Sequence, residues 1–145
     1  YVVYDYKEGH WNIGTLSRTT GVDLGAFRSP LWFDASGNLY NHEFGYTHDS
    51  APYLESGPIP MGAGDNVMRV NEIIPDEGTQ GEVSLTFKTR FYPNGDETSH
   101  GPFSMANPVS VRLQGRQVRM RVTSARIADW RVGTMRLGVL AGSKR

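Results

Sequence analysis

Residues Val109 to Val139 read VSVRLQGRQVRMRVTSARIADWRVGTMRLGV, and this stretch decides the fold class. Its apolar side chains recur at every second residue, with arginines between them. A period of two is typical of strands that bury one face. The apolar positions are odd-numbered from Val109 to Leu113 and even-numbered from Val118 to Val122, so the phase changes around Gly115. A tight turn or a β-bulge at Gly115 would absorb this change, and we favour the bulge.

The composition also favours an all-β protein. With 38% apolar and 21% charged residues, the 145-residue chain belongs with globular proteins and has room for one ordinary domain or two small ones. The chain contains 17 Gly and 8 Pro, and hardly any window has helical apolar spacing. Only Val122 to Trp130 is expected to hold a short helical turn. We therefore expect many short strands joined by turns.

Several classes of protein are disfavoured by what the sequence lacks. There is no cysteine, so disulfide frameworks and thiolate metal sites are excluded. No apolar run approaches the ~18 residues that a membrane-spanning helix needs. The chain opens with YVVYDYKEGHW rather than with a signal segment or an initiator Met, so we expect it to begin within a longer polypeptide or to be a processed piece.

The neutral formal charge hides an asymmetry along the chain. Residues 1–106 carry 6 Lys and Arg against 14 Asp and Glu, whereas residues 107–145 carry 9 against 1. The two parts therefore differ in sign, at −8 and +8. Such polarity suits contact with an acidic partner, which could be another copy of the chain, a neighbouring protein or nucleic acid. The alternative is that the strand arginines simply face solvent.

The first part of the chain predicts two β-hairpins. Tyr1 to Tyr6 and His10 to Leu16 flank a turn at Gly9, and Leu31 to Phe33 and Asn38 to Phe44 flank the turn Asp34-Ala35-Ser36-Gly37. Thr19 to Ser29, between the hairpins, reads as a loop. The two hairpins resemble part of a β-propeller blade array. We place a domain boundary near residue 62, which gives a hairpin region over 1–62 and an antiparallel β domain over 63–145.

The second part predicts a small β-sandwich-like sheet. The proline-rich segment Tyr46 to Gly64 is expected to be a linker or an edge segment. The expected strands are Asn66 to Ile74, Val83 to Tyr92, Val109 to Val122 and Trp130 to Leu140. Thr98 to Pro108 reads as an extended connection limited by its prolines. Four or five antiparallel strands in this region would be enough for a sandwich or a packed sheet.

No pattern of residues predicts a metal site, a cofactor or a catalytic centre. His42-Glu43 and His48-Asp49 have no recognised ligand spacing, and Asp34 to Asn38 lacks the acidic positions of a calcium loop. Gly62-Ala63-Gly64-Asp65 lacks the strand and helix of a phosphate cradle and reads as a hinge. Ser99-His100 lies in a turn-rich segment, without the geometry of a catalytic triad. We therefore expect no metal, no cofactor and no enzymatic activity.

The basic residues of the last third are the candidate functional residues. Alternating arginines on one sheet face could contact phosphates, but aromatic stacking partners are scarce there. Arginine is also favoured at protein interfaces, where it pairs with carboxylates, and we prefer this interpretation. The candidates for a subunit interface or a phosphate contact are Arg112, Arg116, Arg119, Arg121, Arg131 and Arg136.

Several segments, taken together and in chain order, resemble a known family. They are Glu8-Gly9-His10-Trp11, Gly37 to Gly45, Arg69 to Asp76 (RVNEIIPD), Gly101-Pro102-Phe103, Gly115-Arg116-Gln117 and Trp130 to Gly133. The chain resembles the C-terminal part of the nozzle or tail-hub proteins of short-tailed bacteriophages, also described as packaged-DNA stabilisation proteins. No single segment is diagnostic, but the resemblance covers nearly the whole chain.

The resemblance implies a structural protein of the virion tail. Such a subunit carries a β-propeller, most of which would precede Tyr1. It assembles with copies of itself as a ring, often a hexamer, around the DNA exit channel and helps to retain and eject the genome. The implied partners are other tail or portal-adaptor proteins, with non-specific contact to genomic DNA. A ring needs two different faces that meet head to tail, and the charge asymmetry would provide them.

Two other functions remain open from the sequence. The first is a carbohydrate-binding β-sandwich module of a phage or bacterial surface protein. Its stacking platform would be Trp11, Trp32, Tyr40, Tyr46 and Tyr53, although aromatics in strands are more often core residues. The second is a DNA-binding sheet protein, whose affinity would fall steeply with salt.

Overall fold

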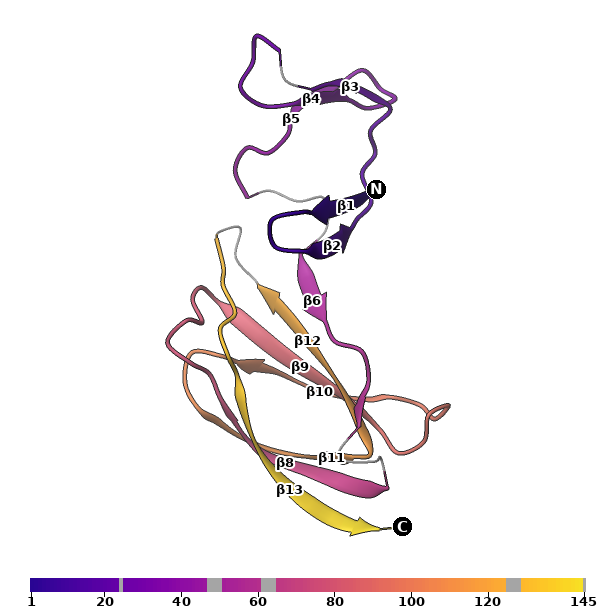
Figure 1. Cartoon of the computed structure of the whole chain (residues 1–145), viewed down its shortest axis with the longest axis vertical. Helices are drawn as coiled ribbons and strands as arrows, with labels where there is room; N and C mark the ends of the chain where they lie inside the picture. Colours follow the sequence, from indigo (N-terminus) through magenta and orange to yellow (C-terminus); the bar gives the residue numbers. More distant parts are fainter. Residues whose placement is uncertain (24, 47–50, 61–64, 125–128, 145) are drawn as a thin grey trace. The chain divides into compact units, whose positions relative to one another are not determined.

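The computed structural model describes residues 1–23, 25–46, 51–60, 65–124 and 129–144 (Figure 1). The chain divides into two compact units, Tyr1–Asp49 and Ser50–Arg145, and each is described by itself. This division lies before the boundary expected near residue 62, because the segment after Ser50 pairs with a strand of the second unit. The expected hinge at 62–64, the pair His48-Asp49 and the centre of the expected helical turn lie outside the described residues.

Every regular element among the described residues is a β-strand, and all strand pairs are antiparallel, as the sequence predicted. No described helix is long and apolar enough to cross a membrane.

The first unit begins with the hairpin of strands β1 (Val2–Asp5) and β2 (His10–Ile13). Its pairing places Tyr4 opposite Trp11, with ring centroids 4.5 Å apart. Gly9 closes the turn with a φ of 71°, a backbone conformation that glycine adopts without steric cost. The predicted first hairpin is therefore confirmed.

The other sheet of the first unit has three strands, β3 (Thr20–Val22), β4 (Leu31–Phe33) and β5 (Leu39–Asn41). The hairpin β4–β5 is confirmed, and Gly37 in its turn has a φ of 83°. The prediction of a continuous loop over Thr19 to Ser29 is wrong, because Thr20–Val22 pairs with β4. A propeller blade has four strands, so the propeller resemblance of these sheets stays a prediction.

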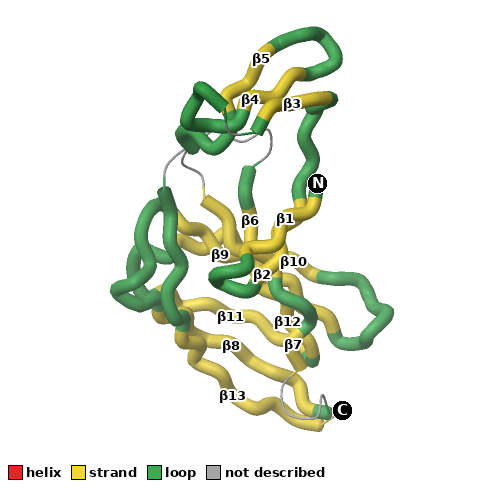
Figure 2. The backbone as a smooth tube through the Cα atoms, turned by 45° about the horizontal axis from the view of Figure 1, so that its top comes forward, coloured by secondary structure: helices red, strands yellow, loops and turns green. Residues whose placement is uncertain are grey.

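The second unit contains two sheets (Figures 1 and 2). We call them the first sheet and the second sheet. The strands of the first sheet follow the order β10 (Thr98–Ser104), β9 (Val83–Arg90), β12 (Gln117–Ser124) and β6 (Tyr53–Glu55), with β7 (Ile59–Pro60) also paired to β12. The strands of the second sheet follow the order β11 (Val109–Gly115), β8 (Asn66–Ile74) and β13 (Arg136–Lys144).

The two sheets of this unit bury one common core. Along β9, buried and half-buried side chains alternate, as expected for a strand that covers a core with one face. The largest fully buried side chains of this common core are Phe87, Leu85, Val70 and Ile73. The remaining buried members of this cluster are Met68, Val83, Met105, Val111, Leu113, Val118 and Val122. The expected small sandwich thus has its core between β8 and β11 on one side and β9 and β12 on the other.

At Gly115 the chain crosses from the second sheet to the first, and this crossing accounts for the change in apolar phase. The prediction of a bulge there is therefore wrong. Strand β11 pairs with β8 and β12 pairs with β9, and the chain bends between them at Arg116. The backbone N–H of Arg116 donates to the carbonyl oxygen of Arg90 over 3.0 Å. Because both apolar sets must face the same core from opposite sheets, the apolar phase reverses at the corner.

Other boundaries in the second unit need correction. The segment Thr98 to Pro108, expected to be only a connection, contains strand β10, whose register shifts between His100 and Phe103. The last strand begins at Arg136 rather than at Trp130. Tyr53–Glu55 and Ile59–Pro60 confirm the edge alternative for the proline-rich segment.

Candidate functional site

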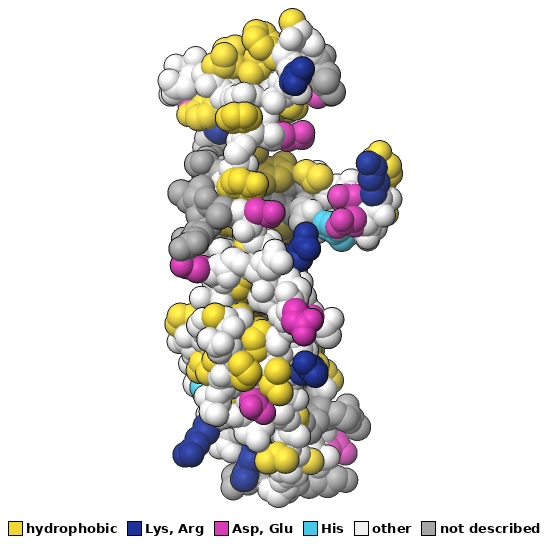
Figure 3. Space-filling view, turned by 90° about the vertical axis from the view of Figure 1, so that its left-hand side faces the viewer, with side chains coloured by type: hydrophobic (Ala, Val, Ile, Leu, Met, Phe, Trp, Pro, Cys, Tyr) yellow, Lys and Arg dark blue, Asp and Glu magenta, His cyan; other side chains and the backbone are white. Residues whose placement is uncertain are grey.

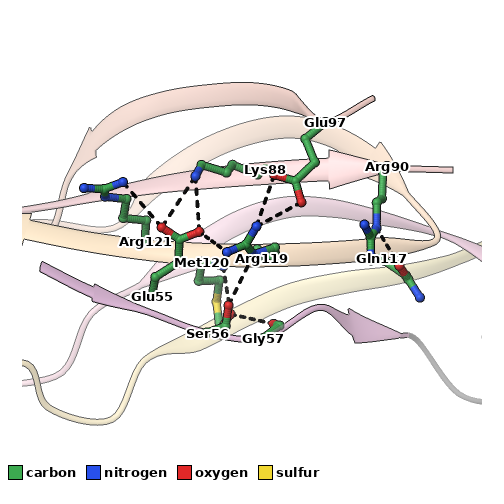
Figure 4. Close-up of polar contacts among 10 residues, drawn as sticks. All are labelled: Glu55, Ser56, Gly57, Lys88, Arg90, Glu97, Gln117, Arg119, Met120 and Arg121. Atoms are coloured by element: carbon green, nitrogen blue, oxygen red, sulfur yellow. Dashed lines mark hydrogen bonds and ion pairs between the residues drawn. The ribbon is translucent and has the colours of Figure 1, made fainter. Parts of the chain in front are cut away.

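Two of the predicted arginines form ion pairs within the chain. Glu55 on the edge strand β6 lies between Arg119 and Arg121 of β12 and Lys88 of β9 (Figure 4). Lys88 Nζ is 3.1 Å from the Glu55 carboxylate, Arg119 Nη2 is 2.5 Å away and Arg121 Nη1 is 3.5 Å away. The Glu55 side chain is 11% exposed, so these three cations surround a largely buried anion. We call these four residues the Glu55 cluster.

Further contacts fix the two arginines in place. Arg119 Nη1 also lies 3.3 Å from Glu97 Oε1 (Figure 4). The guanidinium carbon of Arg121 lies 3.9 Å from the ring centre of Tyr53. Ser56 joins the same edge to β12, because its hydroxyl accepts a hydrogen bond from Met120 N over 2.9 Å. The guanidinium groups of Arg119 and Arg121 therefore bind the chain's own carboxylates.

The surroundings of Glu55 hold it in its charged form. Burial by itself raises the pKa of a carboxyl group. The hydrogen bond and charge of Lys88 outweigh burial, together with the charges of Arg119 and Arg121, so the pKa of Glu55 lies below its usual 4.5. The cluster is thus a structural link that attaches the edge strand β6 at neutral pH.

The remaining predicted arginines lie elsewhere in the second unit. Arg116 is half-buried at the corner between the sheets, 5.9 Å from the ring centre of Tyr92. Arg131 is exposed, and its backbone forms an isolated bridge with Gln80. Arg112 on β11 and Arg136 on β13 are exposed on the second sheet. The six candidates therefore do not form one row.

Arg69 was not predicted as a candidate from the sequence, although it belongs with Arg112 and Arg136. Arg69 is exposed on β8 between the buried residues Met68 and Val70, just as Arg112 is exposed between Val111 and Leu113. This alternation was visible in the sequence and could have identified Arg69. Within the described residues, no ion pair involves any of these three arginines.

The surface of the first unit is unusual in another way. None of its described residues is buried, yet it carries many large apolar side chains. In the upper part of Figure 3, which holds this unit, such side chains lie open at the surface. On hairpin β1–β2 the pairs Tyr4–Trp11 and Val2–Ile13 share one face, because they are two positions apart in register. These four side chains are between 49% and 80% exposed, and we call them the hairpin apolar face.

The residues of the predicted aromatic platform are divided between three sheets, and Tyr46 lies outside the strands. Trp11 stacks with Tyr4 on hairpin β1–β2, whereas Trp32 and Tyr40 lie opposite each other on β4 and β5. Tyr53 belongs to the second unit, where Arg121 covers its ring.

The polar groups considered for catalysis or metal binding have structural contacts. The Asp34 carboxylate accepts hydrogen bonds from Ser36 N, Asn38 N, Asn38 Nδ2 and Tyr40 Oη, all between 2.9 and 3.0 Å. These four hydrogen bonds close the turn. The pKa of Asp34 is lowered to about 2, first of all by the side-chain hydrogen bond from Asn38. His42 Nε2 accepts a hydrogen bond from Arg18 Nε over 3.1 Å. The ring of His100 lies 3.0 Å from the hydroxyl of Thr89.

One cluster of side chains with metal-ligand chemistry was not predicted from the sequence. Potential ligand atoms of Asp5, Glu8 and His10 lie within 4.8 Å of one another at the turn of hairpin β1–β2. Asp5 Oδ1 already accepts the backbone N–H groups of Lys7 and Glu8, and His10 and Glu8 are well exposed. Exposed groups of this kind are common without an ion, so we assign none.

Comparison with known proteins adds no family to these observations. No protein-family model, no curated protein and no solved structure matches the chain significantly.

Proposed function

We propose that the chain is a structural subunit of a phage tail, a nozzle or hub protein that assembles in a ring around the DNA exit channel. In that role it helps to retain and eject the genome as part of the virion. The proposal rests on the resemblance described above and on one structural observation. That observation is the first unit, which has no buried residue in its described part and exposes an apolar face.

An uncovered unit of this kind argues for assembly on physical grounds. A two-stranded hairpin is marginally stable in water by itself, and three or more strands with a covered apolar face are needed for stability. A partner that covers Tyr4, Trp11, Val2 and Ile13 would stabilise the complex by about 25 cal/mol for each Å² of apolar surface removed from water. Contiguous exposed apolar surface therefore indicates an interaction site.

A subunit of a ring meets its neighbours through two different surfaces. The first unit, with its apolar face, is one surface of this kind, and the second unit offers a folded body with its own core. The other partners in this role are neighbouring tail or portal-adaptor proteins, with non-specific contact to genomic DNA.

The oligomeric state of the purified chain tests the proposal. We expect particles larger than the 16.1 kDa monomer in sedimentation velocity and light scattering, and ring-shaped or filament-shaped particles in negative-stain images. Trp11→Ser should weaken assembly, because it removes the largest side chain of the hairpin apolar face. Phe27→Ser is the matched control, since Phe27 is 65% exposed outside that face. A chain that stays monomeric at all concentrations up to about 100 μM would contradict the proposal.

A carbohydrate-binding module is the second candidate. The observation in its favour is the exposed Trp11 ring against Tyr4, because sugar rings pack against exposed aromatic rings. Glycan-array binding by a monomeric chain, abolished by Trp11→Ser, would favour this candidate over the tail subunit.

A further inference from the structure

The outer face of the second sheet carries three arginines on three neighbouring strands. Arg112 lies on β11, Arg69 on β8 and Arg136 on β13, and these strands run side by side (Figure 2). Each arginine is exposed and lies next to inward-facing apolar residues of its own strand. All three side chains therefore lie on the face turned away from the core. We call them the second-sheet arginines.

The second-sheet arginines differ from those of the first sheet in their charge balance. On the first sheet, Glu55 and Glu97 pair with Lys88, Arg119 and Arg121. On the second sheet, no described carboxylate forms an ion pair with an arginine. The outer face of the second sheet is thus a basic surface whose three arginines no described carboxylate neutralises.

The other unit of the chain has the complementary charge. Residues 1–49 carry 3 Lys and Arg against 6 Asp and Glu, and residues 50–145 carry 12 against 9. In the first unit, Glu8 and Asp23 are exposed carboxylates, and Glu8 also lies 3.6 Å from His10 Nδ1. The first unit of each copy is therefore acidic in net charge and the second sheet is basic, which is the requirement for contact between unlike surfaces.

We propose that the second-sheet arginines bind the acidic first unit of a second copy of the chain. The inference rests on the proposed function and specifies its subunit contact. Each copy would offer its first unit to one neighbour and its second sheet to the other. Such a heterologous contact produces a ring where the rotation closes and a filament where it does not. The charge pairs select and orient the neighbour, and the hairpin apolar face adds buried area.

Two complementary double variants test this contact. The first, Arg69→Glu with Arg112→Glu, reverses the basic face and leaves the first unit unchanged. The second, Glu8→Lys with Asp23→Lys, reverses the acidic surface and leaves the second sheet unchanged. Each alone should associate at least tenfold more weakly than the unchanged chain in sedimentation velocity at about 50 mM salt. Mixed in equal amounts, the two variants should associate again, because the intact acidic unit of the first meets the intact basic face of the second and their two reversed surfaces are also of opposite charge.

Single variants control for the change in net charge. Arg112→Glu should weaken association more than Arg131→Glu, because Arg131 is exposed but lies outside the second sheet. Far-UV circular dichroism of every variant checks that the strands are retained. Association of the unchanged chain should also weaken as salt rises from about 50 to 500 mM.

The outcomes separate this inference from the proposed function. If the unchanged chain never associates, the proposed function fails and this contact fails with it. If the chain associates but both double variants associate equally well, only this contact is overturned. A nucleic-acid backbone is the competing occupant, and fluorescence anisotropy with a short DNA duplex detects it. Loss of duplex binding with unchanged association in the Arg69→Glu, Arg112→Glu variant would assign the face to phosphates and overturn the proposal.

Discussion

The carboxylate of Glu55 lies 3.1 Å from the ammonium group of Lys88, although strand β12 separates their two strands. The Lys88 side chain therefore reaches across β12, where Arg119 and Arg121 contact the same carboxylate. The segment that contains Glu55 holds only short strands, so backbone pairing alone attaches it weakly. Ion pairing in the Glu55 cluster supplies a specific reason for this edge to stay paired.

Glu55→Gln should destabilise the second unit by about 1 to 2 kcal/mol, because it leaves three cations without their shared, largely buried anion. Urea denaturation followed by circular dichroism measures the change. Glu97→Gln is the matched control and should cost less, since Glu97 is 26% exposed and pairs with Arg119 alone. Equal losses of unfolding free energy in the two variants would show that the Glu55 cluster stabilises the fold no more than the single pair of Glu97 with Arg119.

The stabilising effect of Glu55 should disappear in acid. Its pKa is lower in the folded chain than its ordinary value of 4.5. A carboxylate with a lowered folded pKa stabilises the fold fully above the unfolded value and loses that effect as the pH falls through the folded value. The difference in unfolding free energy between the unchanged chain and Glu55→Gln should therefore be constant from pH 7 to about 5. It should then shrink below pH 4.5, and a difference that grows in acid would contradict the assignment.

Asp34→Ala should open the turn of hairpin β4–β5, because four hydrogen bonds to its carboxylate would be lost. Amide hydrogen exchange at Asn38 should accelerate at least tenfold at neutral pH. Ser36→Ala is the control, since Ser36 contributes its backbone N–H and not its side chain. The pKa of Asp34 is about 2, so the protection in the unchanged chain should persist to about pH 3. Loss of protection near pH 5 would rule out this carboxylate as its source.

Local patterns predicted the strand whose burial alternates cleanly, Val83–Arg90, apart from its last two expected residues. Asn66–Ile74 was predicted to the residue, although its alternation is interrupted, because the turn that begins at Pro75 ends it. Thr20–Val22 was missed, because it has no such alternation and is a strand only through its pairing with β4. The charge partners could not be predicted either. Arg121 and Glu55 are 66 positions apart, and a periodic pattern carries no information about contacts at that separation.

The corner at Gly115 also depends on contacts that a local sequence pattern cannot predict. Its close packing allows a further prediction. The sequence showed the phase change but not the two sheets that require it. A Cβ on Gly115 would lie 3.0 Å from Thr89 Cβ and 3.2 Å from the carbonyl oxygen of Arg90, so only glycine fits without a shift of its neighbours. Gly115→Val should destabilise the second unit by about 1 to 3 kcal/mol, as overpacking does in other cores.

Gly57→Val is the matched control for this corner, because a Cβ at Gly57 meets nothing within 4 Å. Urea denaturation of both variants should separate them by at least the lower figure of about 1 kcal/mol. If the bend at Arg116 were a simple bulge in one continuous sheet, the two substitutions would have similar effects, because no second sheet would press on Gly115. A difference between them therefore tests the crossing itself, on which the common core of both sheets depends.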